Sequence, residues 1–147
     1  DPMPPLTGDA DRLVQVFTNL IENALEHTPP GGRIRVSAHT APGGIQVAFS
    51  DSGKGIPKQD IPYIFDRFYQ ADKSRAKSGR RGTGLGLTIS RSIIEKLGGR
   101  IWAANNPAGG ASFRFTLPVP ADQGSFEPVT TQVDVERGRP VRLEPTR

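Results

Sequence analysis

The stretch Arg80-Arg81-Gly82-Thr83-Gly84-Leu85-Gly86-Leu87 combines two arginines with three glycines and continues into an amphipathic pattern. The glycines remove three β-carbons, so the backbone can adopt positive φ and bring its N–H groups close to an anion. Apolar residues spaced by four predict a helix over residues 85–97, whose N-terminus would carry unpaired N–H groups and partial positive charge. The stretch predicts a phosphate-binding loop. Taken alone, it is explained equally well by a glycine-rich turn that only caps a helix.

Neither common nucleotide-binding fingerprint fits this loop. It lacks the G-x-x-x-x-G-K-[ST] spacing, and no G-x-G-x-x-G follows a predicted strand, because a charged segment precedes the glycines. Both of the corresponding nucleotide-binding folds are therefore disfavoured.

The composition restricts the class of protein. A chain of 147 residues has the size of one domain and can bury roughly 70% of its unfolded surface. The absence of cysteine excludes disulfides and thiolate metal sites, and two histidines without an H-E-x-x-H pattern leave little for zinc. No apolar run approaches the ~20 residues that span a bilayer, and the first residues do not form a signal peptide. We expect a soluble chain in which residues 1–8 are an entry segment from a missing N-terminal region.

The net charge of +4 is confined to one segment. Residues 70–81 hold five basic side chains and one acidic side chain, which leaves 14 basic and 14 acidic side chains elsewhere. Charge concentrated beside the glycines fits a small polyanion better than a nucleic acid bound along a broad face, so we expect no nucleic-acid partner.

The remaining periodicities predict an α+β fold. Helical spacing covers residues 9–27 and 61–69, and alternating apolar residues predict strands at 33–39, 45–49, 100–104 and 111–119. This order is typical of helices stacked on one face of a sheet. Residues 121–147 are poor in large apolar side chains, and we expect a flexible C-terminal tail, with a weak hairpin around Gly138 as the alternative.

Polar candidates lie in two segments of this framework. Asn19 and Asn23 are four residues apart, so both carboxamides emerge from one side of the predicted helix, although two solvated asparagines are the simpler alternative. Asp51 ends a predicted strand, and Gly53 and Gly55 after it would let a flat ligand approach a fixed acceptor. An ordinary Asp-Ser-Gly turn is the alternative there.

Together, the segments resemble the catalytic and ATP-binding domain of sensor histidine kinases, a Bergerat fold shared with type II topoisomerase and chaperone ATPases. The resemblance rests on four segments in the family's order: NLIENA at 19–24, DSGKGI at 51–56, FDRF at 65–68 and GTGLGL at 82–87. It implies a two-layer sandwich of a mixed β-sheet with about three helices on one face. ATP would bind within an ATP-binding catalytic domain at residues 9–120, under a lid at about 70–82.

The resemblance also implies roles for individual residues. Asp51 would accept a hydrogen bond from the adenine amino group, and Asn23 would bind Mg²⁺ through its side-chain oxygen. Basic lid residues and the backbone amides of residues 82–87 would hold the phosphates. The expected ATP-binding residues are Asn19, Asn23, Glu26, His27, Asp51, Gly53, Gly55, Ile56, Tyr69, Gln70, Lys73, Arg75, Arg81, Gly82, Thr83, Gly84, Leu85, Gly86 and Leu87.

The implied activity is phosphotransfer. Asn19 stands where the superfamily's ATPases carry a water-activating glutamate, and a carboxamide cannot accept a proton at neutral pH. We therefore expect γ-phosphoryl transfer from Mg-ATP to a histidine on a separate dimerisation and phosphoacceptor domain, and then signalling to a response regulator. The acceptor histidine and the general base are not in this chain. The implied location is the cytoplasmic portion of a membrane-anchored sensor.

Two positions depart from the family pattern. Glu26 and Gln70 stand where relatives often carry lysine and arginine, and we hypothesise that the basic lid compensates for the lost positive charge. An anti-sigma-factor-type serine kinase and a degenerate nucleotide-binding or docking module are the alternatives to a histidine kinase.

Overall fold

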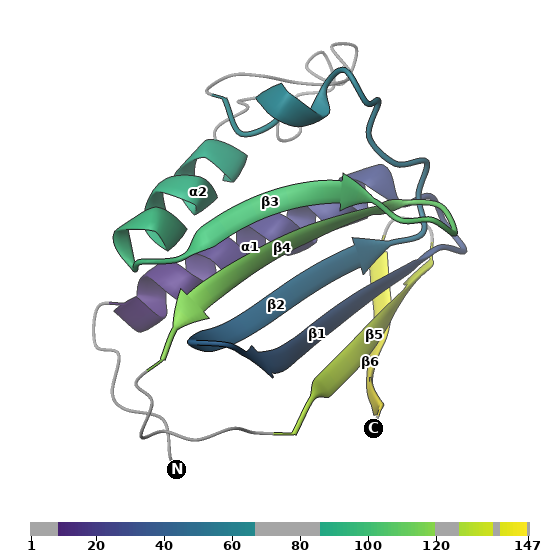
Figure 1. Ribbon diagram of the computed structural model, residues 1–147. Coiled ribbons are helices and arrows are strands. Elements are labelled where there is room, and N and C mark those ends of the chain that lie inside the picture. The colour runs from purple at the N-terminus through teal and green to yellow at the C-terminus, as the bar shows by residue number, and fades with distance from the viewer. Residues whose placement is uncertain (1–8, 67–85, 120–126, 137–138, 147) are drawn as a thin grey trace.

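The computed structural model describes residues 9–66, 86–119, 127–136 and 139–146. Figure 1 shows two layers, a twisted sheet and the helices packed against it. In chain order the elements are α1 Asp9–His27, β1 Arg33–Ala41, β2 Gly44–Asp51, the 3₁₀ turn η1 Ile61–Tyr63, α2 Gly86–Lys96, β3 Arg100–Asn105, β4 Ala111–Pro118, β5 Val129–Glu136 and β6 Arg139–Thr146. The expected α+β sandwich is confirmed.

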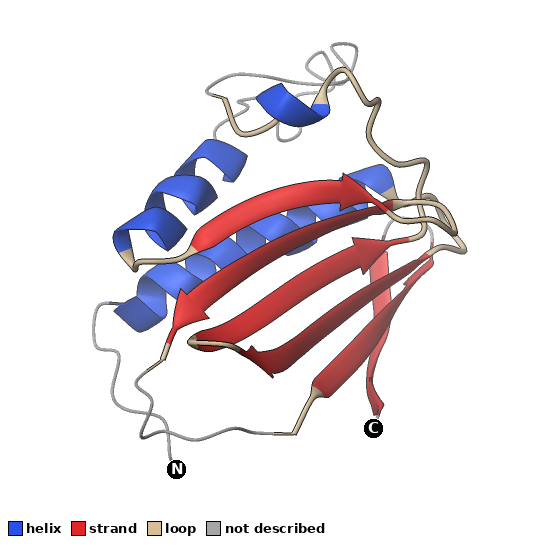
Figure 2. Ribbon diagram, in the orientation of Figure 1, coloured by secondary structure: helices blue, strands red, loops and turns tan. Residues whose placement is uncertain are grey.

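The sheet has six strands in the order β3-β4-β2-β1-β5-β6. All five pairings between the described strands are antiparallel, so the expectation of a mixed sheet is wrong for this part of the chain. Three of the pairs are hairpins with short connections, whereas parallel neighbours require long crossovers. Figure 2 displays the strands and the helices by class.

The core forms where both α-helices meet one face of the sheet. Val16 and Leu20 of α1 and Ile94 of α2 are fully buried in one cluster with aromatic residues of β2 and β4. The ring of Phe17 lies edge-on to Phe49, with centroids 5.3 Å apart. Val47 and Phe49 of β2 and Phe113 and Phe115 of β4 place alternate positions in this core, while Ala48 and Ser112 between them are buried on the other face of the sheet.

Local signals account for the ends of the helices. Gly98, at φ +89°, follows the last turn of α2, and the Gly99 amide donates to the Ile94 carbonyl at 2.9 Å. This is the arrangement of a glycine C-cap. Of the helix expected at 61–69, the structure describes residues 61–66, which contain only the turn η1. The described part of the chain therefore has two α-helices and one 3₁₀ turn instead of about three helices. Neither α-helix in this described part is long and apolar enough to cross a membrane.

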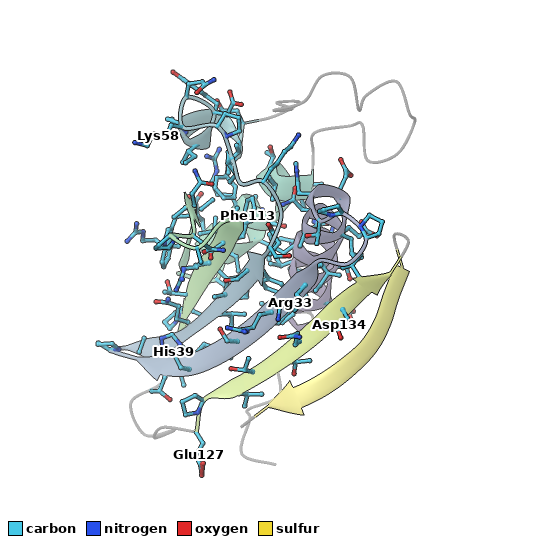
Figure 3. The ribbon with its side chains drawn as sticks, turned by 90° about the vertical axis from the view of Figure 1, so that its right-hand side faces the viewer. Arg33, His39, Lys58, Phe113, Glu127 and Asp134 are labelled. Atoms are coloured by element: carbon cyan, nitrogen blue, oxygen red, sulfur yellow. The ribbon has the colours of Figure 1, made fainter. Side chains whose placement is uncertain are left out.

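The segment expected to be a flexible tail contains a hairpin instead. Strand β5 pairs with β1, and β6 pairs with β5. Val133 and Val135 are buried in a second cluster with Ala24 and Ile34, and the alternation of these valines with polar residues matches a strand buried on one face. Figure 3 shows Arg33 and Asp134 on the neighbouring strands β1 and β5. The hairpin covers a strand edge that would otherwise expose unpaired backbone groups.

Candidate functional site

One face of α1 carries polar side chains that contact the start of α2. The Asn19 carboxamide donates to the Gly86 carbonyl at 3.1 Å and to the Ser90 hydroxyl at 3.2 Å. Ser90 is fully buried, and Gly86 is the first residue of α2. These bonds join α1 to the N-terminus of α2, the end of a helix that favours anions.

Asn23 lies one turn further along the same face. Its Nδ2 atom is buried and has no hydrogen-bond partner among the residues that the structure describes. A buried unpaired amide costs free energy, so such an atom in a native protein requires an explanation. A phosphate oxygen would accept from Nδ2, and the same carboxamide rotated by 180° would offer Oδ1 to a cation.

Asp51 is a buried carboxylate at the end of β2, with 5% of its surface exposed. Its Oδ1 atom accepts from the Gly53 amide at 2.9 Å and from the Ala111 amide at 3.2 Å. Both hydrogen bonds that the carboxylate receives within the described residues converge on Oδ1. The second oxygen, Oδ2, is therefore the acceptor left for a ligand.

The glycines after Asp51 sit where a side chain would not fit. A β-carbon on Gly53 would lie 2.2 Å from the His27 carbonyl oxygen, so the last residue of α1 packs directly against this loop. Gly55 has φ +84°, and its β-carbon would lie 2.8 Å from Oδ1 of Asn105. The loop from Asp51 to Ile56 is thus held between the end of α1 and the turn that joins β3 to β4.

Asn105, the last residue of β3, and Asn106, the first residue of the turn, contact the loop and were missed by sequence reasoning. The side chain of Asn105 bonds both backbone groups of Ile56, and Asn106 donates to the Asp51 carbonyl at 3.3 Å. The available signal was a pair of asparagines before Pro107, which predicts a turn without indicating what the side chains contact. Ser90 was also missed, because a serine inside an amphipathic helix has no distinctive pattern.

The structure brings together part of the expected site. Asn19 contacts Gly86, and the His27 backbone, Asp51 and Gly53 form a second contact region at the C-terminal end of α1. Ile56 and Leu87 pack against the main core, and Glu26 is half-buried. The remaining expected residues lie outside the described ranges and stay predictions: Tyr69, Gln70, Lys73, Arg75, Arg81, Gly82, Thr83, Gly84 and Leu85.

A metal ion would need ligands from a bound molecule. Within the described ranges, no group of three or more histidine, aspartate or glutamate side chains is arranged to hold one. The donor set fits Mg²⁺ only as Asn23 together with oxygens of a ligand, which is how this hard ion is commonly held in phosphate sites.

Comparison with known proteins identifies the family. Residues 8–121 match the model of the histidine kinase-, DNA gyrase B- and HSP90-like ATPases. The sensory kinase SasA of Synechococcus elongatus is 39% identical over 118 residues, which cover 80% of this chain and 30% of SasA. The histidine-protein kinase BaeS of Escherichia coli is 41% identical over 115 residues, covering 78% of this chain and 24% of BaeS.

Solved structures agree with this assignment. The mycobacterial sensor histidine kinase MprB superposes with a TM-score of 0.65 at 30% identity, covering 74% of this chain and 72% of that one. The catalytic domain of histidine kinase ThkA gives a TM-score of 0.64 at 34% identity, covering 78% and 70%. Full-length ShkA in complex with AMPPNP gives 0.62 at 30% identity, covering 73% and 21%.

The chain belongs to the histidine kinase-, DNA gyrase B- and HSP90-like ATPase family, as an ATP-binding catalytic domain of the sensor histidine kinase type. It spans less than a third of the length of the curated relatives described above.

Proposed function

We propose that this domain binds Mg-ATP across α1 and donates the γ-phosphoryl group to a histidine on a separate phosphoacceptor domain. The observation that carries the proposal is the Asp51 carboxylate, buried at the end of β2 with Oδ1 occupied by two backbone amides. These bonds orient the carboxylate before any ligand arrives, so little free energy is spent on ordering it during binding.

The orientation of Asp51 suits adenine. The second carboxylate oxygen can accept a hydrogen bond from the adenine amino group. Guanine presents a carbonyl oxygen at the same ring position. With guanine, the carboxylate oxygen and the guanine carbonyl oxygen would face each other as two acceptors in a buried site. Neither would have a hydrogen-bond donor, which costs free energy. The AMPPNP complex of ShkA, an adenine nucleotide bound to a protein of similar fold, supports the same conclusion.

The polar residues in the C-terminal half of α1, one to two turns before His27, suit the phosphates. The Asn23 amide has no partner within the described residues, and Asn19 is bonded to the N-terminus of α2. Bound Mg²⁺ would neutralise phosphate charge, and Asn23 is the residue that we assign to it. Lys73, Arg75 and Arg81 stay predicted phosphate ligands, since they lie outside the described ranges.

Transfer to a protein nucleophile is favoured over hydrolysis. Asn19 faces α2 with its amide nitrogen, as a hydrogen-bond donor, and cannot take a proton from water. In the proposed step the bond between the γ-phosphorus and the bridging oxygen breaks, and a bond to the imidazole nitrogen forms. ADP leaves, and the imidazole proton passes to a base outside this chain. The named sensor kinases among the relatives support a histidine acceptor and a response-regulator partner over a serine kinase.

Calorimetric titration with ATP, ADP and GTP, with and without Mg²⁺, tests the binding step on the parent and on Asp51→Asn. In the variant, Oδ1 keeps its two amide donors and Nδ2 replaces the second oxygen, so a donor faces the adenine amino group. We expect ATP affinity to fall at least tenfold and the preference for adenine over guanine to shrink. Transfer of ³²P to a supplied phosphoacceptor helical hairpin then tests the chemistry.

Failure to bind any adenine nucleotide in a folded parent would leave the docking module as the better reading. Binding without transfer to the histidine hairpin, but with transfer to a serine of a protein substrate, would support the serine kinase instead.

A further inference from the structure

Residues at and near the turn between β3 and β4 hydrogen-bond to the Asp51–Ile56 loop at both ends of the loop, at Asp51 and at Ile56. At the far end, Asn105 Oδ1 accepts from the Ile56 amide at 2.7 Å, and Asn105 Nδ2 donates to the Ile56 carbonyl at 2.8 Å. This two-way pairing determines the orientation of the carboxamide, because the reverse orientation would set donor against donor and acceptor against acceptor. One side chain thus replaces the pair of backbone bonds that a neighbouring strand would supply.

At the near end, the turn residue Asn106 and the first residue of β4, Ala111, hold Asp51. The Asn106 side chain donates to the Asp51 carbonyl at 3.3 Å, and the Ala111 amide donates to Asp51 Oδ1 at 3.2 Å. A chain of side-chain bonds anchors Asn106 in turn, because its Oδ1 accepts from Ser112, whose hydroxyl lies 2.9 Å from that of Ser50. Between the two ends, Ser52 is bonded to Arg33 of β1, Gly53 and Gly55 have no side chain, and the Lys54 side chain is exposed, so no apolar side chain packs this loop from within.

We propose that Asn105 and Asn106 are positioning residues for nucleotide recognition, which hold the Asp51–Ile56 loop in the conformation that accepts the base. This inference rests on the proposed function, because it names what holds the proposed adenine acceptor in place. Neither asparagine needs to touch the ligand. Without these hydrogen bonds the loop samples other conformations. The apparent affinity for the nucleotide then falls in proportion to the fraction of molecules whose loop can bind the base.

Asn105 is the better residue for a test because it is exposed. Hydrogen bonds that compete with water contribute little to global stability, so Asn105→Ala is expected to fold. A matched control exists at the other end of the same hairpin: Thr116 Oγ1 accepts from the Arg100 amide at 3.3 Å, remote from the loop along the strands. Thr116→Val removes that side-chain bond while keeping the shape of the residue.

Three measurements on the parent, Asn105→Ala and Thr116→Val make up the experiment. Calorimetry with ATP and GTP should give about tenfold weaker ATP binding and a reduced preference for adenine in Asn105→Ala, with parental values in Thr116→Val. Amide hydrogen exchange without nucleotide should accelerate at Gly53 as well as at Ile56. The Gly53 amide bonds Asp51 and not Asn105, so a bond that mattered only locally would leave its exchange unchanged. Urea unfolding should give nearly equal midpoints.

The outcomes separate the two ideas. If the parent binds no adenine nucleotide, the proposed function fails, and Gly53 exchange still decides whether Asn105 positions the loop. If the parent binds ATP and folded Asn105→Ala binds it equally well, the positioning role is refuted. Should Asn105→Ala not fold, Asn105→Asp provides the second test: it keeps the acceptor for the Ile56 amide but sets an oxygen against the Ile56 carbonyl. It should also bind ATP more weakly than Thr116→Val, and parental affinity in that variant would overturn the proposal.

Discussion

A single carboxamide links the two α-helices at the site. Asn19 donates to both Gly86 and Ser90, and the hydroxyl that it meets is completely buried. Removal of the donor leaves the buried Ser90 hydroxyl short of a partner. Such groups cost more when left unpaired than the hydrogen bond contributes when formed. The same contact places the start of α2 against the polar face of α1.

A double-mutant cycle on Asn19→Ala and Ser90→Ala measures this link. We expect each substitution to lower the free energy of unfolding by about 1–2 kcal/mol, and the pair to be coupled by at least about 0.5 kcal/mol. Urea unfolding without nucleotide provides the values. Asn19→Ala combined with Thr116→Val is the control and should be additive, because the two sites share no partner. Additivity in the test pair would contradict the assigned bond.

Two adjacent glycines provide a comparison of steric and conformational effects. Gly109 and Gly110 both have positive φ, at +111° and +82°. A β-carbon on Gly110 would lie 1.9 Å from the Asp51 carbonyl oxygen, whereas one on Gly109 would meet nothing within 4 Å. Only Gly110 is therefore required for the close approach of the turn to Asp51.

Gly110→Ala should consequently cost more than Gly109→Ala. We expect about 1–2 kcal/mol for backbone strain alone at Gly109, and roughly 3 kcal/mol at Gly110, where overpacking against a backbone atom adds to the strain. Thermal unfolding of the two variants measures the difference, and ATP affinity should fall only in Gly110→Ala. Equal costs would show that the close contact with Asp51 does not exist in solution.

At the scale of elements, the C-terminal hairpin supports α1 from the side opposite α2. Backbone bonds from Gly31 to Val135 and from Val135 to Gly32 tie β5 to the turn that follows α1. Ala24, beside Asn23 in the sequence, shares the second core cluster with Val133 and Val135. The hairpin lies beyond residues 8–121, the part matched by the family model, so it is an addition to the common core.

Substitution of the buried and exposed valines of β5 tests whether the hairpin is formed. Val133 is 5% exposed and Val129 is 53% exposed on the same strand. Val133→Ala should lower the free energy of unfolding by about 2 kcal/mol, and Val129→Ala by less than about 0.5 kcal/mol. Chemical denaturation of both variants gives the comparison. Small and equal effects would indicate that residues 129–136 do not pack on β1.

At the scale of the whole molecule, the proposed site spans both layers. Asp51 belongs to the sheet, Asn19 and Asn23 belong to α1, and Gly86 begins α2. A nucleotide that contacts all four residues would link the sheet, α1 and α2, which also pack against one another in the core. Its binding free energy should therefore appear as stability of the entire domain.

Thermal unfolding with Mg-ATP tests this coupling. At a concentration of about 100 times the dissociation constant, binding adds about 2.7 kcal/mol, which corresponds to a rise in Tm of roughly 8 °C for a domain of this size. GTP at the same concentration controls for ionic effects and should raise Tm much less. The Asp51→Asn variant should lose most of the ATP effect. Equal shifts with ATP and GTP would indicate charge binding without recognition of the base.

Much of the fold could be predicted because its signals are local. The hydrophobic periodicity predicted α1, α2 and the strands of the β1–β2 and β3–β4 hairpins. Gly98 lies at the end of α2. The spacing of NLIENA, DSGKGI, FDRF and GTGLGL indicated the family. The tail was misjudged because Val133 and Val135 form a strand only with β1 as a partner, and a short isolated hairpin is marginal in water.

By itself, the sequence determined the elements, their order and the residue types available for phosphate and adenine recognition, since these depend on neighbours within a few positions. The tertiary structure alone decided which atoms meet. Asn19 reaches Gly86 across 67 residues and Asn105 reaches Ile56 across 49, and Asp51 acquires its orientation from amides on two different segments. A short polar side chain bonds equally well to water or to many backbone groups, and only the packing of helices on the sheet selects its partner.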